Sequence, residues 1–309
     1  MALCLVTGGA GFIGSHIVHN LLARGDNVRV LDNFSTGKRE NLSGIQGPLE
    51  VVEGDLRNSD EVLNAVRGVD LVFHQAAEVS VPRSMEDPQT CFDVNVKGTH
   101  NLLEAARNSG VQRVVIASSC AVYGNSQNLP LVESEPPQLL SPYSASKFVT
   151  EIYADLYSHV FGMDVVALRY FNVYGPRQSP QSDYAAVIPI FMHRMINGLS
   201  PTVYGDGFQK RDFVFVEDVV RANFLAAEAS DAVGKVYNVC TGHEYSLQDL
   251  LDALAELIPD SVNVNYGPPR PGDIYRSIGN PGKAAKELGF EAQDKFIDGL
   301  ARTLEWMRL

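Results

Sequence analysis

Tyr143 and Lys147 have the residue types and the spacing of a proton-transferring pair. They lie four residues apart in the segment Ser-Pro-Tyr-Ser-Ala-Ser-Lys, and no other tyrosine of the chain has a lysine four positions later. Side chains at i and i+4 of a helix share one face, and an adjacent ammonium lowers the pKa of a phenol from its usual value of about 10. Tyr143 could then exchange a proton with a sugar or alcohol hydroxyl near neutral pH. Taken alone, such a pair is more often solvated on a helix surface, so its context decides the interpretation.

A glycine-rich turn near the start of the chain supplies that context. Gly8, Gly11 and Gly14 follow an apolar segment and precede an amphipathic stretch. Such glycines allow a tight turn, close approach of a pyrophosphate to backbone N–H groups and close helix–strand packing. Asp32, 18 residues after Gly14, is placed to bind the ribose hydroxyls and to repel the 2′-phosphate of NADP. The sequence therefore predicts NAD, and a nucleotide turn with a tyrosine base indicates hydride chemistry.

Two alternatives stay open around this turn. Lys38 and Arg39 follow Asp32 closely enough to keep NADP in consideration. Asp55, just after the third expected strand, either bonds the adenine amino group or caps a helix over 58–66.

The elements expected to position these residues alternate between strands and helices. Short runs rich in Val, Leu and Ile are typical of strands that are buried on both faces. They fall at Leu3–Thr7, Val28–Leu31, Leu49–Glu53, Leu71–Gln75, Arg113–Ser118 and Val165–Tyr170. Further strands over Val214–Val216 and Val236–Val239 are expected to return to the sheet, with a helix over 217–228 between them. The pattern predicts an α/β fold with a doubly wound parallel (Rossmann) sheet.

A smaller α/β substrate-binding domain is expected beside this sheet. After Pro176 the pattern becomes irregular and rich in Gly and Pro. We assign 1–175 and about 213–242 to the NAD-binding domain. Residues of about 176–212 and 243–309 then form the substrate domain, over the carboxyl ends of the strands, where open α/β sheets bind ligands.

The helix that carries Tyr143 has recognisable start signals. Ser141 is a candidate N-cap and Pro142 a candidate first residue. Phe148, Ile152 and Leu156 are expected to form its buried stripe. Ser118 and Ser119 end the preceding strand, where a hydroxyl could meet the reacting alcohol oxygen.

Composition excludes several classes of function. The 309 residues are 45% apolar and carry a net charge of −12, which argues against nucleic acid or an anionic membrane as a partner. No run of about 20 apolar residues could span a bilayer. Its scattered cysteines, Cys4, Cys91, Cys120 and Cys240, indicate neither a disulfide framework nor a metal site. A cytoplasmic protein is expected.

An ordered set of segments resembles the extended short-chain dehydrogenase/reductase family, and within it the nucleotide-sugar 4-epimerases. The segments are TGGAGFIGSH (7–16), GDL (54–56), HQAA (74–77), NVKGT (95–99), SSCAVYG (118–124), SPYSASK (141–147), RYFNVYGPR (169–177), RDFVFVEDV (211–219) and RPGD (270–273). Because they run through almost the whole chain in order, the resemblance is specific.

The resemblance implies roles for individual residues. Tyr143 would take the proton of the sugar 4-hydroxyl, Lys147 would bind the nicotinamide ribose and lower the pKa of Tyr143, and Ser119 would bond the 4-oxygen. The implied NAD-binding set is Gly8, Gly11, Phe12, Ile13, Gly14, Asp32, Asn33, Asp55, Leu56, Gln75, Ala76, Ala77, Asn95, Tyr143, Lys147 and Tyr170. The implied UDP-sugar set is Ser80, Ser119, Tyr143, Asn172, Val187, Tyr204, Arg211, Arg270, Asp273 and Ser277. In it Arg211 and Arg270 would face the diphosphate, which suits paired guanidiniums.

The resemblance also favours one reaction. Related 4,6-dehydratases carry an Asp-Glu pair directly after the catalytic hydroxyl residue, where this chain has Cys120 and Ala121. Related decarboxylases carry a Glu at the position of Ala121. An epimerase needs neither, since hydride leaves carbon 4 and returns to its opposite face. A net reductase and a non-catalytic NAD sensor remain as rival hypotheses.

Substrate size and assembly are further expectations from the resemblance. Ser277 stands where family members restricted to UDP-glucose and UDP-galactose carry a tyrosine. A small residue there predicts acceptance of UDP-GlcNAc and UDP-GalNAc as well, and the segment 79–84 is similar to members that handle N-acetylated sugars. If Ser277 is merely small, this prediction fails. A homodimer through helices within 86–110 and 142–161 is also expected.

Overall fold

The computed structural model describes residues 2–180, 186–259, 263–269 and 274–309. Two of the expected substrate-binding residues, Arg270 and Asp273, lie outside these ranges.

A seven-stranded sheet forms the centre of the fold, in the order β11-β6-β5-β4-β1-β2-β3. Every neighbouring pair is parallel, and the order reverses beside β1, which confirms the predicted doubly wound fold. The strands are β1 (Leu3–Thr7), β2 (Asn27–Asp32), β3 (Leu49–Glu53), β4 (Leu71–His74), β5 (Arg113–Ser119), β6 (Asp164–Tyr170) and β11 (Val236–Val239). Each predicted strand of this sheet agrees with these bounds to within one residue.

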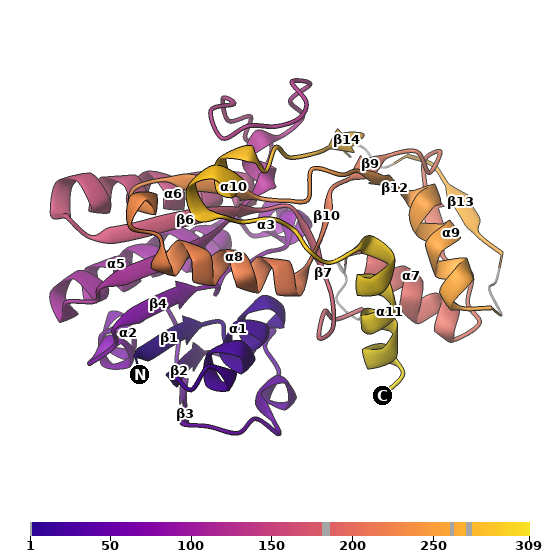
Figure 1. Cartoon of the computed structure of the whole chain (residues 1–309). Coiled ribbons are helices and arrows are strands. Elements are labelled where there is room, and N and C mark those ends of the chain that lie inside the picture. Colours follow the sequence, from indigo (N-terminus) through magenta and orange to yellow (C-terminus); the bar gives the residue numbers. More distant parts are fainter. Residues whose placement is uncertain (1, 181–185, 260–262, 270–273) are drawn as a thin grey trace.

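Helices cover both faces of the sheet (Figure 1). Alternate residues of β1 point to opposite faces, as the two-residue period of a strand requires. Val6 packs in a cluster with α1 and α8, whereas Leu5 packs in a second cluster with α2, α5 and α6. The bounds are α1 (Phe12–Ala23), α2 (Ser59–Val66), α5 (Gly98–Ser109), α6 (Pro142–Phe161) and α8 (Val216–Glu228).

A third apolar cluster lies beside the sheet, among the elements at the right of Figure 1. It is built by α7 (Val187–Ile196), α9 (Leu247–Leu257) and α11 (Phe296–Met307). Small sheets connect these helices: β13 (Asn265–Gly267) pairs with β8 (Thr202–Tyr204), and β9 (Lys210–Arg211) lies between β12 (Tyr245–Ser246) and β14 (Arg276–Ser277).

One expected strand has a different partner from the one predicted. The segment predicted as Val214–Val216 forms β10 (Phe213–Phe215), which pairs with β7 (Asn172–Tyr174) in a separate two-stranded sheet. The prediction that it returns to the main sheet is wrong, because its backbone pairs with β7, which follows β6 after the single residue Phe171 and lies outside the main sheet. The later strand, β11, does join the main sheet. Helix α10 (Gly282–Leu288) packs against β11 and shares the cluster of α1 and α8.

Helix α6 begins as predicted, but its buried face agrees with the predicted one only in part. Ser141 caps it reciprocally with Ser144, and Pro142 is its first residue. Of the expected stripe, however, Ile152 is 50% exposed and Leu156 is 41% exposed. The face toward the sheet consists mainly of small and polar residues: Ser144, Ser146, Lys147, Thr150, Glu151, Ala154 and Tyr157. Phe148 is partly buried against the core cluster that contains Val6, as predicted. The prediction is wrong for Ile152 and Leu156, because the helix turns its small and polar residues toward the sheet and these two side chains outward.

The remaining short elements shape the rim of the sheet. They are α3 (Val81–Glu86), α4 (Pro88–Phe92), the 3₁₀ turns Arg39–Leu42, Cys120–Tyr123 and Ser230–Ala232, and the π-helical turn Asp93–Lys97 between α4 and α5. Such turns often mark functional sites, and this one contains the buried Asn95. Over the described ranges, no helix combines the length and apolarity needed to cross a bilayer. Among the described residues, no three His, Cys, Asp or Glu side chains lie close enough together to hold a metal ion.

Candidate active site

The predicted catalytic residues meet at the carboxyl end of β5. Ser119 ends that strand, and Tyr143 lies in the first turn of α6. Burial raises the pKa of Tyr143 to about 12, and its hydrogen bond with Ser119 opposes this rise. The structure thus brings the serine and the phenol together, as the sequence predicted.

The expected lowering of the Tyr143 pKa by Lys147 is not found. The Lys147 ammonium donates to the Ala117 carbonyl of β5 at 2.8 Å, and burial of the phenol is the largest influence on its pKa. Burial also lowers the pKa of Lys147 to about 8. A helical spacing of four residues places both groups on one face, but desolvation decides the pKa of each.

A buried ion pair holds the polar face of α6 against the sheet. Glu151 accepts two bonds from the Arg169 guanidinium of β6, at 2.8 and 2.7 Å. The same carboxylate accepts a bond from Ser118, the neighbour of Ser119, at 2.5 Å. Its charge also raises the pKa of Lys147, against the effect of burial. Glu151 was not predicted from the sequence, although it lies one turn beyond Lys147 on the same face.

A chain of hydrogen bonds runs from the nucleotide turn to the backbone of Tyr143. Thr7 bonds His74 Nδ1 at 2.7 Å, and His74 Nε2 bonds Thr99 at 2.9 Å. The Thr99 hydroxyl donates to the Asn95 carbonyl at 2.5 Å, so it accepts the bond from His74. Asn95 Nδ2 then donates to the Ser146 hydroxyl at 2.9 Å, and that hydroxyl donates to the Tyr143 carbonyl at 2.8 Å.

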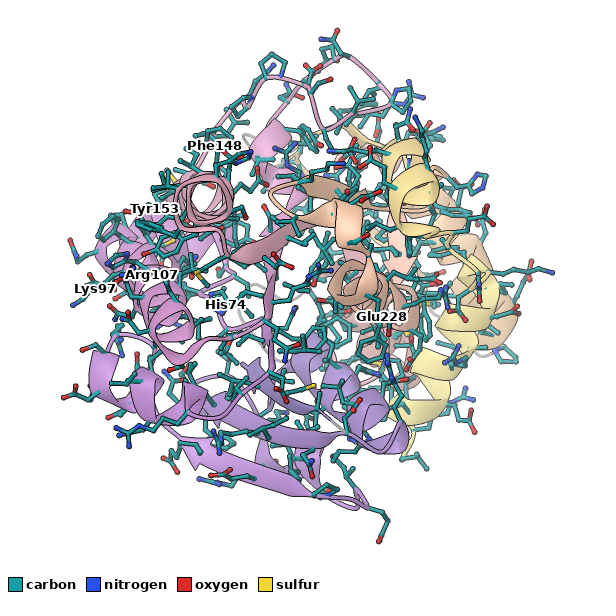
Figure 2. The ribbon with its side chains drawn as sticks, turned by 60° about the vertical axis from the view of Figure 1, so that its left-hand side comes forward. His74, Lys97, Arg107, Phe148, Tyr153 and Glu228 are labelled. Carbon is teal, nitrogen blue, oxygen red and sulfur yellow. The ribbon has the colours of Figure 1, made fainter. Side chains whose placement is uncertain are left out.

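His74 is neutral in this chain and has one defined tautomer. Its Nε2 carries the proton, because Thr99 has no second hydrogen to donate. Burial, and to a lesser extent the charge of Lys147, lowers the pKa of His74 to about 3. Figure 2 shows His74 inside the molecule, between the side that carries Tyr153 and the side that carries Glu228. The segments 74–77 and 95–99 belong to the family resemblance, but no role for His74 or Thr99 was predicted from the sequence.

The glycine turn has the geometry of a dinucleotide site. Gly8 has φ +66°, and a Cβ there would lie 2.8 Å from the backbone of Ala76. A Cβ on Gly14 would lie 2.1 Å from the Gly8 carbonyl oxygen. Gly11 is the N-cap of α1 and has no side chain to accept bonds from the first-turn N–H groups of Phe12, Ile13 and Gly14. These N–H groups and the helix dipole suit a pyrophosphate, so the residues present fit NAD.

Asp32 lies beside this turn with its carboxylate held by the backbone. It accepts from the N–H groups of Ala10 at 2.9 Å and Phe34 at 2.8 Å. Arg39 is one of the two basic residues that left NADP as an alternative. Its guanidinium lies 4.0 Å from the centre of the Phe34 ring and pairs with Glu53. Because Arg39 is already paired with Glu53, this arrangement favours NAD over NADP, whose 2′-phosphate would need a free basic partner.

The other expected cofactor residues fall at the rim of the same edge. Asp55 receives a forked bond from Arg57 at 2.9 and 2.7 Å and a bond from Asn33 at 2.9 Å, and these bonds lower its pKa. The helix cap is Asn58, so the capping alternative for Asp55 is wrong. Leu56 is buried.

Gln75 and Tyr170 are also brought together. The Gln75 amide and the Tyr170 hydroxyl bond each other at 3.1 Å, and both bond Asn223 of α8. Ala76 and Ala77 follow Gln75 over the glycine turn, where Ala76 N donates to Thr7 at 3.3 Å.

Three expected substrate residues also meet. Ser277 of β14 pairs with Arg211 of β9, and Asn172 donates its N–H to the carbonyl of the residue after Arg211 at 3.0 Å. Ser80 is the N-cap of α3. Val187 begins α7, and Tyr204 ends β8 with 37% of its surface exposed.

The fold and the site together define a class: a Rossmann-fold enzyme that combines a dinucleotide turn with a Ser–Tyr–Lys centre. The sequence profile of the NAD dependent epimerase/dehydratase family matches residues 4–240, and the chain belongs to this family. This confirms the predicted resemblance, enzyme status and NAD as cofactor.

Similar proteins cover the whole chain. A UDP-glucose 4-epimerase of Mycolicibacterium smegmatis is 40% identical over 98% of both chains. A Thermus thermophilus UDP-glucose 4-epimerase, solved with NAD, is 43% identical over 99% of both chains with a TM-score of 0.90. A UDP-N-acetylglucosamine 4-epimerase of Methanobrevibacter ruminantium, solved with UDP-N-acetylmuramic acid, is 39% identical over 99% of this chain and 98% of its own, with a TM-score of 0.95.

Proposed function

We propose that this chain is an NAD-dependent isomerase, a 4-epimerase of UDP-sugars. It would interconvert UDP-GlcNAc with UDP-GalNAc, and UDP-Glc with UDP-Gal, through a transient 4-keto sugar. The observation that carries the proposal is the hydrogen bond between Ser119 and Tyr143 at the carboxyl end of β5, in the same parallel sheet whose strand β1 leads into the dinucleotide turn. The relatives of this chain include 4-epimerases of both kinds of sugar.

Tyr143 would move one proton in each half of the reaction. It accepts the proton of the 4-hydroxyl as a hydride leaves carbon 4, and returns it when a hydride arrives on the other face. NAD, when bound, supplies the hydride acceptor and, through its positively charged nicotinamide, the charge that lowers the pKa of the phenol. Ser119 would hold the 4-oxygen. Binding energy from the UDP group would retain the keto sugar while it turns.

Dehydration and decarboxylation have less support from the residues after Ser119. The thiol of Cys120 has its pKa raised to about 12 by burial, so it stays neutral and cannot act as a base near pH 7. Ala121 has no group that transfers protons. Neither position supplies the acid–base pair that elimination of water requires.

Ser277 supports acceptance of N-acetylated sugars. Its side chain is small and 8% exposed, and β14 places it opposite Arg211. We expect Ser277→Tyr to depress turnover of UDP-GlcNAc selectively, because the ring fills the volume that an N-acetyl group needs. Steady-state rates with UDP-GlcNAc and UDP-Glc measure this selectivity, and equal losses on both substrates would contradict it.

The deciding experiment is proton NMR of the purified protein with UDP-GlcNAc and no added cofactor. Appearance of UDP-GalNAc supports epimerisation with retained NAD. Stoichiometric consumption of added NADH would indicate the reductase instead. An unchanged spectrum from NAD-loaded protein, followed by conversion of UDP-Glc, would restrict the substrate range.

We also propose that the enzyme is a homodimer formed through the helices within 86–110 and 142–161, which are α4, α5 and α6. The outward apolar face of these segments includes Phe92 of α4 and four exposed side chains of α6: Ile152, Leu156, Val160 and Phe161. Figure 2 shows Phe148 and Tyr153 of α6 on the same side of the molecule as Lys97 and Arg107. Sedimentation of wild type and of Leu156→Glu measures the association, and a monomeric wild type would contradict it.

Two further expectations stand as proposals. Residues 1–175 with 213–242 would bind NAD, and 176–212 with 243–309 would bind the nucleotide sugar. Since all four cysteines are free thiols in the structure, a reducing, cytoplasmic location is proposed.

A further inference from the structure

We propose that Asp212 is a positioning residue for the nucleotide sugar, which sets the relative placement of Asn172, Arg211 and Ser277. The inference rests on the proposed function, because that function supplies the substrate roles of these three residues. Asp212 itself would not touch the substrate: it lies between β9 and β10 and is 0% exposed.

The backbone of Asp212 connects the proposed substrate residues directly. Its carbonyl accepts from the Asn172 N–H at 3.0 Å, and its own N–H donates to the Ser277 carbonyl at 3.0 Å. Arg211 precedes it in the chain. A shift of this one residue would therefore displace contacts from β7, β9 and β14 together.

We call the place where β7, β9 and β14 meet at Asp212 the junction. The side chain of Asp212 connects this junction to two further segments by hydrogen bonds. One carboxylate oxygen accepts from the N–H of Thr241 at 2.9 Å and from its hydroxyl at 2.7 Å. The other accepts from the N–H of Gly242 at 3.0 Å and of Gly279 at 3.3 Å. Burial raises the pKa of Asp212, and the four donors oppose this rise without cancelling it. They hold the buried carboxylate in one place, so its position is strongly specified.

The two glycines allow these donors to approach. Gly242 has φ +73°, a conformation that favours glycine. A Cβ on Gly279 would lie 2.6 Å from both Cys240 Sγ and Phe171 Cζ. A side chain at either position would therefore be unfavourable, and glycine lets the backbone N–H groups of Gly242 and Gly279 reach Asp212.

The junction lies close to the catalytic centre. The charges of Arg211 and Asp212 both act on the thiol of Cys120, the residue after Ser119. A substrate held by the residues around Asp212 would therefore extend toward Ser119 and Tyr143.

Asp212→Asn tests the inference with little change in volume. The amide has a single acceptor oxygen and turns an NH₂ group toward backbone donors, which leaves N–H groups unpaired. We expect the Kd for UDP, measured by calorimetry, to rise about tenfold or more. The KM for the UDP-sugar should rise with it, while kcat changes little. NAD content, measured after denaturation, should stay at the wild-type level.

Asp218→Asn is the matched control. Asp218 is also 0% exposed, but its carboxylate pairs with Arg221 of the same helix and accepts from the backbone N–H of Gln293 and Asp294, at 2.9 and 3.4 Å. We expect this variant to lose stability while keeping the wild-type Kd for UDP. Equal effects of both variants on UDP binding, or an unchanged Kd in Asp212→Asn, would overturn the inference.

Thr241 provides a second route if Asp212→Asn does not fold. Thr241→Val removes one of the four donors and should raise the Kd for UDP, whereas Thr241→Ser keeps the hydroxyl and should restore it. Unchanged binding in Thr241→Val would overturn the inference. If wild type itself fails to bind UDP, the proposed function fails and the inference with it. Loss of binding in the Asp212 variant alone supports both.

Discussion

Replacing Thr99 with valine removes one hydroxyl that serves two buried partners. Thr99 is 2% exposed, accepts from His74 Nε2 at 2.9 Å and donates to the Asn95 carbonyl at 2.5 Å. Valine keeps the shape but can do neither, so the His74 N–H stays buried without an acceptor.

The expected loss of stability follows from these two bonds. An unpaired buried donor costs about 1–3 kcal/mol, and the lost bond to the carbonyl about 0.5–1.5 kcal/mol. Together they predict a decrease in the free energy of unfolding of about 1.5–4.5 kcal/mol. Because Asn95 is also bonded to Ser146, and Ser146 to Tyr143, we expect kcat to fall as well.

Thr303→Val is the control for this measurement. Thr303 is 1% exposed, but its hydroxyl donates only to the Gly299 carbonyl within α11, at 2.7 Å. Losing such a bond within a helix costs about 1 kcal/mol or less. Urea unfolding at matched NAD occupancy, compared at constant m, measures both variants. The same loss of stability in both, with kcat unchanged in Thr99→Val, would refute the reasoning.

Three further predictions concern the cofactor turn and the site. His74 has a pKa near 3 when folded and about 6.5 when unfolded, so the unfolded chain binds the additional proton between these values. Stability should therefore fall by about 1.4 kcal/mol per pH unit on acidification below about 6.5, and a His74→Gln variant with an equally steep decline would contradict this. Tyr143→Phe should lose at least about 100-fold in turnover while retaining NAD, and full activity by the NMR assay would exclude Tyr143 as the base. Gly14→Ala places a Cβ 2.1 Å from the Gly8 carbonyl oxygen and should be purified with little NAD, so wild-type NAD content would contradict the proposed turn.

The sequence by itself determined the parts of this protein that depend on local spacing. Short continuous runs of Val, Leu and Ile identified the strands of the sheet, and Ser141 and Pro142 marked the start of α6. Gly8 and Gly14 indicated the dinucleotide turn, because only glycine fits such close backbone approaches. These features require no knowledge of distant residues.

Tertiary structure alone decided what surrounds each of these groups. An apolar stripe on α6 was predicted to be buried, yet Ile152 and Leu156 are exposed, because periodicity identifies a face without saying which neighbour covers it. Likewise, spacing paired Tyr143 with Lys147, but burial by the assembled fold raises the pKa of Tyr143. The Asp212 carboxylate accepts hydrogen bonds from residues that lie 29 to 67 positions later in the sequence. Desolvation and long-range hydrogen bonds are properties of the folded chain, so a pattern of neighbouring residues cannot contain them.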